Sequence, residues 1–159
     1  MTHICFIGLG SNLGEPSGQL RLAISDLDQL PDTRVLASSA FYRSAPIGYL
    51  DQPDFVNAVV KIRTSLSPRQ LLSAMLGIER KHGRERTFCN APRTLDLDVL
   101  LYDDIELHEP GLAIPHPQMH RRAFVLQPLL EIAPDCMIPS VGSVRQALQG
   151  CLDQVLEKL

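Results

Sequence analysis

The sequence lacks the motifs that mark several common enzyme classes. No Gly-Lys-Ser/Thr follows the glycines at positions 8, 10 and 14, and their spacing differs from GxGxxG, so neither a Walker A loop nor a dinucleotide fingerprint is present. No GxSxG elbow or HExxH helix indicates a serine hydrolase or a zinc protease. The four cysteines form no CxxC pair, so we expect reduced thiols rather than a zinc site or a disulfide framework.

Composition narrows the class further. No apolar run approaches the ~20 residues of a membrane span, and no basic-then-apolar signal segment starts the chain. A net charge of −3 is unlike the strongly basic surface of a general nucleic-acid binder. Only 5% of the residues are aromatic, and no RNP1 pattern favours an RNA-binding sheet. We therefore expect a cytoplasmic protein with one domain over residues 1–159, which contacts neither membrane nor nucleic acid.

Hydrophobic periodicity predicts an α+β fold. The order strand, helix, strand, strand, helix, strand up to residue 102 is that of a ferredoxin-like βαββαβ core, with an antiparallel sheet and helices on one face. Its strands are expected at residues 3–9, 35–43, 54–64 and 93–101, and its helices at residues 16–30 and from Pro68, after an N-cap at Ser67, to a cap at Gly83.

Additional C-terminal helices are expected to cover other surface. Residues 119–132 are predicted to be helical at least in part, with a break or kink at Pro128. Ser143 is predicted to start a final amphipathic helix. Its apolar side would carry Leu148, Cys151, Leu152, Val155 and Leu159.

The strand at residues 93–101 carries the clearest chemical signal. Its alternation places Leu95, Leu97, Val99 and Leu101 on one face and Asp96 and Asp98 on the other. A buried carboxylate needs a partner, and Mg²⁺ is commonly held by one or two carboxylates together with substrate phosphates. The alternative is a solvated strand face on which acids have no special role.

Arginines precede this strand. Arg84, Arg86 and Arg93 supply charge that suits phosphate oxygens, which suggests a polyphosphate substrate; a solvated basic loop is the alternative. His116, held between two prolines, is interpreted either as a phosphate or nucleotide contact or as a structural residue. Phe55 and Asn57 form either a pocket wall that reads a flat heterocycle or ordinary packing with a satisfied amide.

Several ordered motifs together resemble one family. Residues 91–98 (APRTLDLD) are similar to the signature of the 6-hydroxymethyl-7,8-dihydropterin pyrophosphokinases. The resemblance extends over nearly the whole chain. It includes IGLGSNLG at residues 7–14, FYRSAP at 41–46, DQPDFVN at 51–57, Pro115-His116, RAF at 122–124 and PLLEIAP at 128–134.

The resemblance implies ATP-dependent pyrophosphoryl transfer to the hydroxymethyl group of the pterin, with release of AMP, in folate biosynthesis by a monomer. By position, Asp96 and Asp98 would bind two Mg²⁺ ions and act in catalysis with Arg84 and Arg93. The pterin pocket would consist of Ser44, Ala45, Phe55, Asn57 and Phe124. ATP would be bound by Arg84, Arg86, Arg93, His116 and Arg122, with Arg86 on a loop that closes over the substrates.

Two positions depart from the family pattern. Cys89 replaces a loop arginine, and Pro117 stands where some members have tyrosine. The metal and pterin positions show no disabling change, so we expect activity. The residues leave the general base open between Asp98, a metal-bound water and no base at all. Two other functions remain open as alternatives. One is a different Mg²⁺-dependent phosphoryl or nucleotidyl transferase, and the other is a non-catalytic nucleotide- or RNA-binding module.

Overall fold

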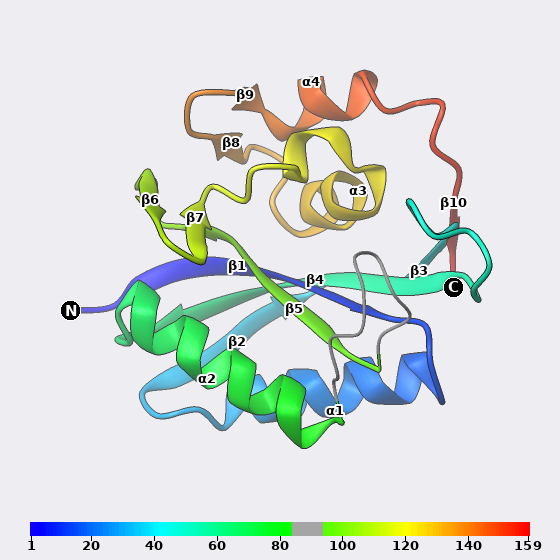
Figure 1. Ribbon diagram of the computed structural model, residues 1–159. Helices are drawn as coiled ribbons and strands as arrows, with labels where there is room; N and C mark the ends of the chain where they lie inside the picture. Colours follow the sequence, from blue (N-terminus) through cyan, green and yellow to red (C-terminus); the bar gives the residue numbers. More distant parts are fainter. Residues whose placement is uncertain (84–93) are drawn as a thin grey trace.

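A central antiparallel sheet organises the computed structural model, which describes residues 1–83 and 94–159 (Figure 1). The strands hydrogen-bond in the order β10-β3-β4-β1-β5, and β2 pairs with the far half of β4. These strands are β1 (His3–Ser11), β2 (Thr33–Ser38), β3 (Tyr42–Ser44), β4 (Phe55–Thr64), β5 (Asp96–Tyr102) and β10 (Leu156–Lys158). The long strand β1 therefore lies between β4 and β5 and contacts both.

Helices cover both faces of this sheet (Figure 1). Helices α1 (Pro16–Asp28) and α2 (Pro68–Lys81) lie on one face, and α3 (Ala123–Ile132) and α4 (Val144–Gln149) lie on the other. Short elements complete the C-terminal half: the hairpin β6 (Leu107–Glu109)–β7 (Leu112–Ile114), the 3₁₀ turn η1 (Met119–Arg121) and the hairpin β8 (Met137–Ile138)–β9 (Gly142–Ser143). No helix in the described part of the chain is long and apolar enough to span a membrane.

Strand β4 shows how the sequence divides the core into two layers. Val56, Ala58, Val60 and Ile62 join the apolar cluster under α1 and α2, as their alternation predicts. Val59, between them in sequence, joins the second cluster under α3 and α4. Strand β4 is therefore buried on both faces, and only Arg63 near its end is exposed.

Helix α2 begins and ends where the sequence predicts. The Ser67 hydroxyl accepts a hydrogen bond from the backbone N–H of Gln70, and the Gln70 side chain accepts one from the N–H of Ser67. This reciprocal capping box satisfies two N–H groups that the first turn would otherwise leave unpaired. Gly83 follows the helix with a φ of +79°, a left-handed conformation that suits glycine.

The prediction of a single strand at residues 35–43 is wrong. Two strands form, β2 and β3, because the backbone leaves the ladder between them. Ser39 bonds to Val59 through its backbone N–H (2.9 Å to the carbonyl oxygen) and its hydroxyl (3.0 Å from the N–H). The next residue, Ala40, donates its N–H to Glu131 on α3 (2.9 Å). A carboxylate from a distant helix thus ends one strand.

Two further expectations need correction. The register of β5 against β1 skips Leu100, since Ile7 pairs with Val99 and Phe6 with Leu101. This bulge turns Leu101 into the second core cluster, away from the predicted face.

The expected final helix also stops early, at Gln149. The chain then turns at Gly150 and returns as β10 beside β3, which leaves Leu152 and Val155 exposed. The region around Pro128 is helical as predicted, but the chain does not break there, because α3 continues through this proline.

Candidate active site

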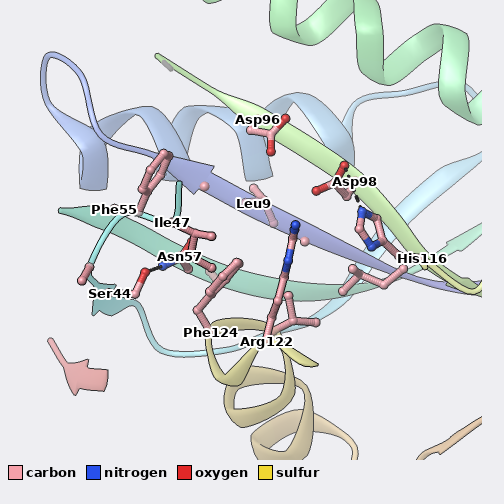
Figure 2. Close-up of a pocket in the computed structure, with 16 residues that line it drawn as sticks. Leu9, Ser44, Ile47, Phe55, Asn57, Asp96, Asp98, His116, Arg122 and Phe124 are labelled. Atoms are coloured by element: carbon pink, nitrogen blue, oxygen red, sulfur yellow. Dashed lines mark hydrogen bonds and ion pairs between the residues drawn. The ribbon is translucent and has the colours of Figure 1, made fainter. Parts of the chain in front are cut away.

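A cavity of about 270 Å³ lies between helix α3 and the face of the sheet that β1, β4 and β5 form (Figure 2). The sequence-predicted site residues in the described part of the chain all line this cavity. They are Ser44, Ala45, Phe55, Asn57, Asp96, Asp98, His116, Arg122 and Phe124. The remaining three, Arg84, Arg86 and Arg93, and the replacement at Cys89 lie outside the described residues.

The central strand contributes glycines to this wall. Gly10 of β1 pairs with Asn57 on one side and Asp96 on the other, and Gly8 pairs with Asp98. A Cβ at Gly10 would lie 3.2 Å from Asn57 Oδ1, and one at Gly8 would lie 3.3 Å from the Leu100 side chain. The absence of side chains therefore leaves space between the amide and the two carboxylates.

Sequence reasoning excluded a Walker A loop and a dinucleotide fingerprint at these glycines. It did not count them as site residues. Their i, i+2 spacing on a strand is the signal that places both on one face. Ile47, Leu100 and Val125 also line the cavity and were not predicted.

Asp96 and Asp98 project from β5 into the same side of the cavity (Figure 2). Leu97 between them is buried in the core, so the strand fixes both carboxylates on one face. Within residues 1–83 and 94–159, no group of three or more His, Cys, Asp or Glu side chains has the arrangement of a metal site. A site with two carboxylates leaves coordination positions for water and phosphate oxygens. Mg²⁺ is usually bound in this way, and not by a cage made of protein ligands alone.

His116 is fixed beside the carboxylates by its backbone and its ring. Its N–H donates to the carbonyl oxygen of Leu100 (3.0 Å), which ties it to β5. The Gln118 N–H donates to its Nδ1 (3.1 Å), so in the neutral ring Nε2 carries the proton. Nε2 lies 4.0 Å from Asp98 Oδ1. Burial, assisted by the charge of Arg122 and opposed by Asp96, lowers the pKa of His116 to about 4.

The opposite end of the cavity combines an amide with two aromatic rings. Asn57 Nδ2 donates to Ser44 Oγ (2.7 Å), and both side chains are buried. The second N–H of Asn57 and its carbonyl oxygen remain a donor and an acceptor side by side. Phe55 comes from β4 and Phe124 from α3 (Figure 2). This end can hold a flat, polar-edged ring.

Arg122 lies between the two ends of the cavity (Figure 2). Its guanidinium carbon is 5.6 Å from the centroid of the Phe124 ring, a cation–π distance that orients the side chain. Arg122 is also the N-cap residue of α3, so the start of the helix sets its place. A cation held between acids and an aromatic end suits an anionic group that spans the two.

The loop that carries Ala45 and Ile47 is tied to the end of β1. Asn12, which is buried, donates from Nδ2 to Gln52 Oε1 (2.8 Å) and to the carbonyl oxygen of Pro53 (3.0 Å). Gln52 donates in turn to the carbonyl oxygen of Tyr49 (2.5 Å). These bonds hold the loop over the aromatic end of the cavity.

Comparison with known proteins gives one consistent family. The family model described as 7,8-dihydro-6-hydroxymethylpterin-pyrophosphokinase (HPPK) matches residues 6–134. A 2-amino-4-hydroxy-6-hydroxymethyldihydropteridine pyrophosphokinase of Pseudomonas aeruginosa is 44% identical over 159 residues, 100% of this chain and 98% of that protein. The protein of the same name from Haemophilus influenzae is 44% identical over 154 residues, 97% of this chain and 96% of its own.

A solved structure supports the fold. Plasmodium falciparum HPPK-DHPS with pteroate superposes with a TM-score of 0.74 over 94% of this chain at 14% sequence identity. This chain spans 42% of that longer chain. At this identity the likeness concerns the fold alone.

We predict that His116 in the metal-free, ligand-free protein titrates with a pKa of about 4, measured by ¹⁵N NMR of the imidazole. Because this folded-state pKa lies below the ordinary 6.5, the unfolded chain takes up the proton first. The neutral ring's contribution to stability is therefore complete above pH 6.5 and is lost as the pH falls towards 4. Arg122→Gln should raise the pKa of His116. An unshifted value near 6.5 in the wild type would contradict this assignment.

Proposed function

Because the chain belongs to the 7,8-dihydro-6-hydroxymethylpterin-pyrophosphokinase family, we infer that it transfers the pyrophosphoryl group of ATP to the hydroxymethyl group of 6-hydroxymethyl-7,8-dihydropterin. The products are the pterin diphosphate and AMP, and the reaction belongs to folate biosynthesis. One observation carries the assignment to this cavity. A carboxylate pair and an aromatic–amide pocket share one wall, with glycines between them.

The pterin is proposed to bind at the aromatic end. Phe55 and Phe124 would stack on its two faces, and Asn57 would bond to the ring edge through its N–H and carbonyl oxygen. Ser44 orients this amide by accepting its other N–H. Ala45 would complete the wall, and its small side chain leaves room for the ring. The hydroxymethyl group would then point across Gly10 towards the carboxylates.

The triphosphate is proposed to bind at the acidic end. Asp96 and Asp98 would hold two magnesium ions, which together with the phosphate oxygens would supply charge neutralisation during the transfer. The donor set fits, since both ligands are carboxylates on one strand face. His116 would donate its Nε2–H to a phosphate oxygen while neutral, and Arg122 would bind a phosphate oxygen as a permanent cation. Arg84, Arg86 and Arg93 stay predicted ATP contacts, with Arg84 and Arg93 also catalytic.

The residues act chiefly by positioning. Phosphoryl transfer demands an attacking oxygen, phosphorus and leaving oxygen nearly in line, with charge neutralised around them. Asn57 fixes the pterin from β4, and Asp96 and Asp98 fix the triphosphate from β5, so β1 between them sets the separation of the two substrates. Closing the cavity around both substrates would exclude water from the reacting phosphorus.

We also propose a ferredoxin-like class for the fold. Strands β5-β1-β4-β3 with α1 and α2 on one face support a ferredoxin-like core, to which α3 and α4 are additions. We propose a single pyrophosphokinase domain over residues 1–159, supported by the pairing of the C-terminal strand β10 with β3 in the main sheet. We still predict that the protein is a cytoplasmic monomer and that it binds no nucleic acid.

The purified protein should convert ATP to AMP only when both Mg²⁺ and 6-hydroxymethyl-7,8-dihydropterin are present. Chromatography of the nucleotides measures this directly, with EDTA and pterin-free reactions as controls. ADP as the product, or AMP formation that does not depend on the pterin, would rule out the function.

Asp96→Ala and Asp98→Ala should each lower kcat at least ~10²-fold, because each removes charge stabilisation that is in place before the reaction. The exposed carboxylate at Asp153 offers a matched control. Asp153→Ala should leave kcat within about twofold, as expected for a surface change. Near-normal turnover of both site variants would refute their assignment as ligands.

Gly10→Ala should raise the KM for the pterin ~10-fold or more, because its Cβ at 3.2 Å would displace the Asn57 amide from its hydrogen bonds. Gly18→Ala, in helix α1 with only an ordinary 3.6 Å contact, is the matched control and should leave KM unchanged. Steady-state kinetics with saturating ATP measures both. Equal KM values for the two variants would show that the space above Gly10 is not used.

A further inference from the structure

Helix α2 brings a buried carboxylate to the outer edge of β5, the strand that carries Asp96 and Asp98. Glu79 is only 2% exposed and does not line the cavity. Its Oε2 accepts a hydrogen bond from the backbone N–H of Leu97 at 2.7 Å. Leu97 is the residue between Asp96 and Asp98, so this bond acts on the backbone that carries both.

Strand β5 ends the order of the main sheet and pairs there with β1. Within residues 1–83 and 94–159, no strand pairs with its outer edge, and an N–H on such an edge needs another acceptor when it is buried. Glu79 supplies that acceptor at Leu97. At 2.7 Å, the bond is short for N–H···O.

The helix that carries Glu79 is fixed to its surroundings. The capping box fixes its start, and Arg69 bonds to Glu109 (3.0 Å) and to the carbonyl oxygen of Pro110 (2.8 Å) in the β6–β7 hairpin. At its last residue, Lys81 bonds to Asp26 of α1 (2.9 Å). The opposite end of β5 is also tied, because Tyr102 donates its hydroxyl to the carbonyl oxygen of Leu66 (2.8 Å).

We propose that Glu79 is a positioning residue for the acidic site, an inference that rests on the proposed function. Its hydrogen bond fixes the Leu97 peptide, and through it the spacing and direction of the Asp96 and Asp98 carboxylates. Loss of a group that orients metal ligands typically weakens metal binding or activity 10–100-fold.

Variants at one position separate reach from charge. Glu79→Gln keeps the length and the acceptor oxygen but removes the charge. Glu79→Asp keeps the charge but shortens the side chain, and Glu79→Ala removes both. Ile78→Ala is the matched control, since Ile78 is the buried apolar neighbour on the same helix.

The first readout is hydrogen exchange of the Leu97 amide by NMR in the metal-free protein. The second is the affinity for Mn²⁺ with an α,β-methylene analogue of ATP, measured by electron paramagnetic resonance. Glu79→Ala and Glu79→Asp should speed the exchange of the Leu97 amide and weaken Mn²⁺ binding, each ~10-fold or more. Glu79→Gln should remain within about threefold of the wild type in both, because the hydrogen bond is kept. Ile78→Ala should lower Tm without changing either.

The proposal is overturned if Glu79→Asp leaves Leu97 protected, if its Mn²⁺ affinity is that of the wild type, or if Ile78→Ala has the same effects. It is equally overturned if Glu79→Gln loses as much as Glu79→Asp. Should Glu79→Ala fail to fold, the Asp and Gln pair still decides. A wild-type protein that forms no AMP would refute the proposed function alone, since exchange of the Leu97 amide tests positioning without any substrate.

Discussion

The antiparallel pairing of β1 with β4 on one side and with β5 on the other is the constraint on which the site depends. Gly10 lies opposite Asn57 and Asp96 at once, so the amide and the first carboxylate are held two strand spacings apart, about 10 Å. Glycine at positions 8 and 10 keeps this interval free of side chains. The proposed pterin and triphosphate sites would therefore face each other across β1.

The two faces of the sheet differ: one is covered by an apolar layer, and the other lines the cavity. The layer under α1 and α2 is apolar and includes Leu97, which sets the direction of the neighbouring acids. The opposite layer is open near the ends of β1 and β4, where α3 supplies Arg122 and Phe124. The same helix reaches back through Glu131 to Tyr42, whose hydroxyl donates to it at 2.5 Å. Desolvation, and after it the Glu131 carboxylate, raise the pKa of the Tyr42 hydroxyl. The hydroxyl therefore keeps its proton, and the hydrogen bond, well above neutral pH.

Local patterns were sufficient for much of the fold and for the Asp96–Asp98 pair, whereas most other candidate site residues were predicted from the family resemblance. The period-two alternation of β4 and the Ser67 capping box depend on neighbours in sequence, and the Asp96–Asp98 pair follows the same alternation. Features set by distant contacts were not predictable. The break before Tyr42 requires Glu131, the bulge at Leu100 requires the register against β1, and the final strand requires β3 as a partner. Glu79 was missed because nothing local distinguishes a buried acid from one on the exposed side of a helix.

A crystal structure with Mn²⁺, an unreactive ATP analogue and 6-hydroxymethyl-7,8-dihydropterin would locate the metal and the pterin together, and so would test both ends of the proposed site at once. We expect anomalous scattering peaks for two ions within bonding distance of the Asp96 and Asp98 carboxylates. We also expect the pterin ring between Phe55 and Phe124, with its edge on Asn57. Metal peaks away from both carboxylates, or a pterin bound outside the aromatic end of the cavity, would contradict this arrangement.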